Sequence, residues 1–158
     1  MTFSADPRTL PARPPSEVEW EDLLVRVEIA ARALRVAVED APADHPGVVQ
    51  ALGTGVRGEM ALQRMLEAMV DGRELPADLG VGAEVVAGDA PSLVAEYGRL
   101  RYRSFLMVQR RGLNVWDWQV RGGPYDGATA YQLFQAAART DGALLAAVRG
   151  AARQGAGA

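Results

Sequence analysis

Glu59 and Asp141 are the residues of this sequence whose types and positions most favour chemistry. Glu59 lies beside an apolar stripe that includes Val56 and Met60, and Asp141 comes three residues before Leu144 on another apolar stripe. Both spacings are helical, so each carboxylate is expected near the core side of its helix. A carboxylate pair there could supply oxygen donors to Mg²⁺ or Mn²⁺, or exchange a proton with a ligand.

An alternative, which we favour, is that each carboxylate pairs with an arginine at the rim of the fold. Arg57 and Arg139 are close enough in sequence to serve. Buried carboxylates in proteins are usually paired. In that case the pair is structural rather than chemical.

Arginines form the next candidate group. Arg99, Arg103 and Arg110 share one face of an expected helix, with Arg101 and Arg111 nearby. Guanidinium groups bind carboxylate and phosphate well, so this face could be an anion site. We favour the simpler interpretation, in which it is a solvated helix face whose arginines pair with acidic neighbours.

The aromatic residues and the single histidine are weaker candidates for a functional site than the carboxylates and arginines. Trp116, Trp118 and Tyr125 could line a pocket over one end of the fold, but such residues more often close a core beneath a long loop. His45 is predicted to lie in the loop before a helix. The chain has no cysteine, and its other basic residues are all arginine, which excludes thiolate nucleophiles, zinc–thiolate sites and Schiff-base lysines.

Composition predicts an ordinary globular domain. The chain has 158 residues, 49% of them hydrophobic and 23% charged, with a net charge of −3. The acidic balance argues against nucleic acid as a partner, and no apolar run reaches the ~18 residues of a membrane span. We expect a cytoplasmic protein with a flexible N-terminal arm (1–15), one domain (16–153) and a disordered tail (154–158).

Apolar spacing predicts four helices, over residues 17–40, 47–71, 91–111 and 130–153. Ser16 and Glu19 form a capping box at the first start, Asp89 or Ser92 is expected to cap the third helix, and Thr129 the fourth. Gly53, Gly55 and Gly58 fall within the second helix, which indicates close helix packing or room for a ligand.

Loop lengths predict the topology of this all-α, four-helix bundle. The first two helices are joined tightly and are expected to be antiparallel neighbours. The link from the second to the third helix can reach ~55 Å when extended, longer than the ~37 Å of a 25-residue helix. We therefore expect an up-down-down-up order with a long crossover.

The chain resembles the DinB/YfiT-like superfamily of four-helix-bundle metalloenzymes. The resemblance rests on the order of a helix Leu-Val-Ala-Glu-Tyr-Gly-Arg-Leu-Arg, the loop Val-Trp-Asp-Trp (115–118), the segment Tyr-Asp-Gly-Ala-Thr ending at 129, and a last helix with Leu133-Phe134 and Asp141. It covers nearly all of the chain after Pro15. The resemblance implies the same fold, a homodimer and a stress-related role.

The family's metal ligands are one histidine on the second helix and two, four residues apart, on the fourth. Matching by pattern places these positions at Thr54, Thr140 and Leu144, and none is histidine. We therefore expect no bound metal and no other cofactor. The candidate ligand-binding residues are those three positions together with Glu59 and Asp141.

Three functions remain open at this point. The first is a metal-free bundle that binds a small molecule between the second and fourth helices, or that has lost catalysis. The second is a homodimeric interaction protein, since Val18, Ile29 and Val36 lie outside the main apolar stripe of the first helix. The third is a residual enzyme that uses Glu59 and Asp141. An open space among the three metal positions would favour the first.

Overall fold

Four helices form the protein, in a computed structural model that describes residues 2–82 and 86–156, apart from the side chains of residues 113, 155 and 156. The helices are α1 (Glu17–Val38), α2 (Pro46–Asp71), α3 (Ala90–Gln109) and α4 (Ala130–Ala156), with short 3₁₀ turns at Pro7–Thr9 and Gly112–Val115. In the described part of the chain there is no extended strand, only isolated bridges. The predicted all-α four-helix bundle is confirmed.

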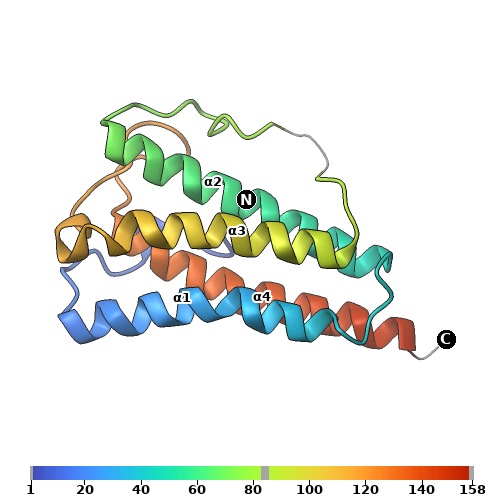
Figure 1. Ribbon diagram of the computed structural model, residues 1–158. Coiled ribbons are helices and arrows are strands. Elements are labelled where there is room, and N and C mark those ends of the chain that lie inside the picture. The colour runs from blue at the N-terminus through green and yellow to red at the C-terminus, as the bar shows by residue number, and fades with distance from the viewer. Residues whose placement is uncertain (1, 83–85, 157–158) are drawn as a thin grey trace.

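The helix directions follow the predicted order (Figure 1). Helices α1 and α4 run one way, and α2 and α3 run the other way, which is up-down-down-up. The link over residues 72–89, of which 83–85 lie outside the described residues, connects the end of α2 to the distant start of α3. The backbone amide of Ala90 donates to the carbonyl of Ala43 at 2.7 Å, which holds the start of α3 beside the α1–α2 connection.

Helix neighbours differ from the prediction in one respect. The main contacts are α2 with α3, α1 with α4, α1 with α3, and α2 with α4. Helices α1 and α2 are thus antiparallel but lie diagonally across the bundle, not side by side. Residues 39–45 connect them, and at ~3.3 Å per residue this segment is long enough to cross the bundle end.

The helix starts are formed by the side chains that the sequence indicates. Ser16 and Glu19 make the capping box of α1, Asp89 caps α3, and His45 accepts from the amide of Val48 at the start of α2. The Thr129 hydroxyl accepts from the backbone amide of Gln132, and the side-chain carbonyl of Gln132 accepts from the backbone amide of Thr129.

The capping box of α1 also changes the pKa of the Glu19 carboxyl. Its hydrogen bonds to Arg13 and to the Ser16 amide lower the pKa of Glu19 to about 2. Its charged form is therefore favoured in the folded chain.

The N-terminal segment was expected to be a loose arm, and the structure places it on the bundle. Phe3 and Leu10 are 4% and 6% exposed and belong to the core. The amide side chain of Gln132 on α4 donates to the carbonyl of Leu10 at 2.7 Å. At the other terminus α4 continues to Ala156, beyond the predicted end, and residues 157–158 lie outside the described residues.

The loop between α3 and α4 closes the core, as the simpler interpretation of its aromatic residues predicts. Tyr125 is buried against Phe3, with ring centroids 5.4 Å apart. Trp116 and Trp118 are half-buried against the same core, and Arg111 lies over the Trp118 ring. No described helix has a stretch long and apolar enough to cross a lipid bilayer.

Candidate ligand-binding site

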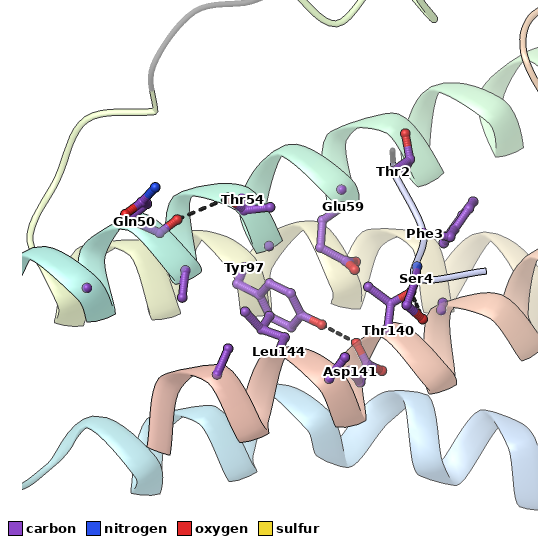
Figure 2. A pocket seen from close by; sticks show the side chains of 17 residues that line it. Thr2, Phe3, Ser4, Gln50, Thr54, Glu59, Tyr97, Thr140, Asp141 and Leu144 are labelled. Carbon is purple, nitrogen blue, oxygen red and sulfur yellow. Dashed lines mark hydrogen bonds between the residues drawn. The ribbon is translucent and has the colours of Figure 1, made fainter. Parts of the chain in front are cut away.

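A cavity of about 480 Å³ opens between α2 and α4, with Tyr97 of α3 at its base and the first residues of the chain at one end (Figure 2). All five site residues proposed from the sequence lie on its wall. The wall comprises Thr2, Phe3, Ser4, Gly47, Gln50, Ala51, Thr54, Gly55, Gly58, Glu59, Tyr97, Ala137, Thr140, Asp141, Ala143, Leu144 and Ala147.

Thr54 and Thr140, two of the positions that the resemblance matches to metal ligands, form local hydrogen bonds. The Thr54 hydroxyl donates to the Gln50 carbonyl one turn earlier, at 3.1 Å. The Thr140 hydroxyl donates to the Ala136 carbonyl at 2.8 Å and accepts from the backbone amide of Ser4 at 3.0 Å. Thr140 therefore holds the N-terminal segment against α4, where it closes one end of the cavity.

Leu144, the third metal position, packs on α2. A Cβ added at Gly55 would come within 2.5 Å of Leu144 Cδ2 and 3.5 Å of Tyr97 Cδ2. The glycine therefore lets the leucine approach the α2 backbone, as the packing interpretation of the glycines predicts. Gly53 and Gly58 have more room, and Gly58 also lies on the cavity wall.

A buried arginine forms the floor beneath the cavity. Arg101, only 2% exposed, donates to both Glu59 oxygens at 2.8 and 2.5 Å and to both Asp141 oxygens at 2.7 Å. It also donates to the Val27 carbonyl of α1 and to the Tyr97 hydroxyl, each at 2.8 Å. The Tyr97 hydroxyl donates in turn to Asp141. All four helices thus meet at one guanidinium.

The predicted pairing of the two carboxylates is correct in kind but places the arginine wrongly. We expected separate partners, such as Arg57 or Arg139, at the rim. The observed partner of both is Arg101, inside the bundle. A guanidinium has five N–H groups in one plane, so it can donate to both oxygens of two carboxylates at once.

Protonation in this cluster is set by burial and by charge. Burial raises the pKa of Glu59, and Arg101 opposes that rise. Burial likewise raises the pKa of Tyr97. Although burial opposes the charge of Arg101, Glu59 and Asp141 raise the pKa of the guanidinium above its usual value. Arg101 is therefore a fixed cation, whereas burial makes the Glu59 carboxyl easier to protonate than an exposed glutamate.

The sequence analysis placed Arg101 beside a solvated arginine face, and this was wrong, because Arg101 is buried. A signal for its burial was present. Leu93, Tyr97, Arg101 and Phe105 are spaced four residues apart, so the arginine lies on the apolar stripe of α3. Its neighbour Arg99 pairs with Glu96 on the solvent side, as expected for that face. A charge on a buried stripe indicates a buried partner of opposite sign.

Both carboxylates of the cluster are paired with Arg101. Within the described residues, no group of three or more histidine, aspartate or glutamate side chains could hold a metal ion. The guanidinium lies between the two carboxylates that an oxygen-donor site would need.

Comparison with models of protein families, with curated proteins and with solved structures finds no match to this chain.

Proposed function

We propose that the protein is a metal-free, DinB/YfiT-like bundle that binds a small molecule in the cavity between α2 and α4. The observation that carries the proposal is the open space of about 480 Å³ at Thr54, Thr140 and Leu144. Its size is within the range of small-molecule sites, and a few polar groups project into a largely apolar wall, as such sites require. A stress-related role, which the resemblance implies, is part of this proposal.

Two adjacent alanines of α4 allow a matched test. Ala146 and Ala147 are both exposed, but only Ala147 lines the cavity. Ala147→Phe should fill the cavity, and Ala146→Phe should leave it open. A fragment library is screened by ligand-observed NMR against wild type and both variants. Fragments that bind wild type and Ala146→Phe, but not Ala147→Phe, support the proposal; a library without such fragments contradicts it.

A second function is favoured by the outer face of α1. Val18, Val25, Ile29 and Val36 are 74%, 54%, 51% and 57% exposed. Val18 and Val36 are about five full turns apart, and the other two lie within about 20° of the line that joins them. A continuous apolar stripe thus faces outward on a helix whose opposite side packs in the core.

This stripe is complementary to itself. Val18 and Val36 are equally far from Val27 in sequence, as are Val25 and Ile29. An antiparallel second copy would therefore place Val18 against Val36 and Val25 against Ile29, which is the arrangement of a two-fold interface. We propose that the protein forms a homodimer through α1.

Charges beside the stripe favour the antiparallel arrangement. Arg32 and Glu21 lie on the same flank at nearly equal distances from Val27, so each would face the other across the two-fold axis. A parallel pair would instead place Arg32 and Glu21 eleven residues apart along the interface, where they could not face each other.

The dimer is tested by light scattering, in which a monomer has a mass of 16.9 kDa. Ile29→Glu should give monomers. Arg32→Glu should weaken the dimer, and adding Glu21→Arg should restore it. A wild-type mass near the monomer value at all concentrations contradicts the proposal, and so does a double variant that is weaker than Arg32→Glu alone.

A further inference from the structure

The charges under the cavity do not balance. One guanidinium, Arg101, faces two carboxylates, Glu59 and Asp141, and all three are largely buried. Among the described residues that line the cavity, those two carboxylates are the charged ones, because Arg101 lies behind them. Figure 2 shows Glu59 and Asp141 coming from opposite walls. A molecule in the cavity therefore meets negative charge.

The carboxylates also retain acceptor capacity. A carboxylate offers about four lone-pair positions. Arg101 donates two hydrogen bonds to Glu59, and Arg101 and Tyr97 together donate three to Asp141. A ligand that donates hydrogen bonds can thus be satisfied without displacing the arginine.

The rest of the cavity wall could contact the apolar part of a ligand. Gly55, Gly58, Ala51, Ala143 and Ala147 line the cavity with little side-chain volume and no charge. Water is a poor competitor against such a wall, so charges that approach the carboxylates there interact more strongly than at the surface.

We infer that the cavity takes a small organic cation, with its ammonium group against Glu59 and Asp141 and its apolar part along the small residues of α2 and α4. This inference rests on the proposed ligand-binding function. A metal ion does not meet the same requirement, because it needs ligand oxygens that converge at short range, whereas an ammonium needs hydrogen-bond acceptors.

Binding of a cation should be coupled to a proton. Glu59 is faced by Arg101 and Tyr97 from α3 and by Asp141 from α4, while α1 contributes the Val27 carbonyl to the same arginine. Burial raises the pKa of Glu59, so at low pH its carboxyl carries a proton that balances the cluster, and at higher pH the cluster has one negative charge in excess. An arriving ammonium competes with that proton, so its affinity should rise with pH until Glu59 is already ionised.

Three probes of one shape test the inference: cyclohexylammonium, cyclohexanol and cyclohexanecarboxylate. Their dissociation constants are measured by NMR titration of the wild type at pH 7. We expect the amine to bind about ten- to a hundredfold more tightly than the alcohol, as hydrogen bonds to charged groups predict, and the carboxylate to bind least. Calorimetry over a range of pH, in buffers of different ionisation enthalpy, should show proton release with the amine alone, at the pH values where Glu59 of the empty cavity is protonated.

Glu59→Gln should remove the proton release and most of the preference for the amine. Asp40→Asn, which neutralises an exposed carboxylate, is the control and should change neither. An alcohol or carboxylate that binds as tightly as the amine overturns the inference, even if Glu59→Gln fails to fold, because that comparison needs only the wild type. If library fragments bind the cavity but the amine does not, the inference fails while the proposed function stands. If nothing binds, both fail.

Discussion

Removing the charge of Arg101 tests how much its pairing with the two buried carboxylates contributes to the stability of the fold. Arg101→Met keeps a long apolar side chain on α3 but leaves Glu59 and Asp141 without a counter-charge. Breaking a buried ion pair by removing one partner costs about 3–5 kcal/mol, because the remaining charge stays desolvated. We expect a loss of that size in the free energy of unfolding at pH 7, a large share of the 5–15 kcal/mol typical of a domain.

The loss should depend on pH in a definite direction. Arg101 lowers the pKa of Glu59 against the effect of burial, so the variant should have a still higher Glu59 pKa. Between the unfolded value near 4.5 and that raised value, the folded state binds more protons than the unfolded state. The free energy of unfolding therefore falls as pH rises through this window. Arg101→Met should be less destabilised at pH 5 than at pH 7.

Urea denaturation followed by circular dichroism provides the measurement, with extrapolation to zero urea. Arg99→Met is the control, since Arg99 forms an exposed pair with Glu96 on the same helix and such pairs contribute about 0–1 kcal/mol. A second variant, Arg101→Met with Glu59→Met and Asp141→Leu, replaces the whole cluster by apolar residues and should recover most of the loss. The reasoning is refuted if Arg101→Met costs no more than Arg99→Met, or if the triple variant is the least stable.

Three further outcomes are expected. Phe3→Ala should cost about 3 kcal/mol in urea denaturation, because Phe3 is 4% exposed; a loss below ~0.5 kcal/mol would mean that the N-terminal segment does not pack on the bundle. The Glu19 carboxyl should titrate near pH 2 by NMR, so that its contribution to stability is present above about pH 4.5 and lost as the pH falls towards 2; a titration near 4.5 would show that its ion pair does not form. Histidine at Thr54, Thr140 and Leu144 together should create a Zn²⁺ site, since all three line one cavity; a folded triple variant that binds Zn²⁺ no better than wild type in calorimetry would mean that the helix pairing or the family resemblance is wrong.

The fold could be predicted because the sequence features that determine it, helix caps and apolar spacing, lie within each helix or at its ends. The capping box at Ser16 and the proline-containing start of α2 fix where helices begin, and apolar spacing fixes which face turns inward. The length of the crossover then limits the direction of α3. The diagonal placement of α1 and α2 was not predictable in this way, because a short connection fixes direction but not which helix becomes the neighbour.

The cavity wall was predictable only in part. Glu59 and Asp141 were found because they lie next to apolar stripes at helical spacing, and the same argument applied to Arg101 would have found their partner. The burial of Phe3 was not accessible by that argument, because Pro7 and Pro11 leave the segment without a helical period that could be recognised. Its placement depends on tertiary contacts with Tyr125 and with α4.

Arg101 is the structural centre of the bundle. A central cation that several helices bind at once holds the helices in register, whether the cation is an ion or a side chain. Here the guanidinium is bound by α2 through Glu59, by α4 through Asp141 and by α1 through the Val27 carbonyl. Because the cation is covalently part of α3, it lies behind the carboxylates and leaves the cavity in front of them open. Under the proposed function, the two carboxyl groups that Arg101 holds at the cavity would then also determine which ligands the cavity attracts.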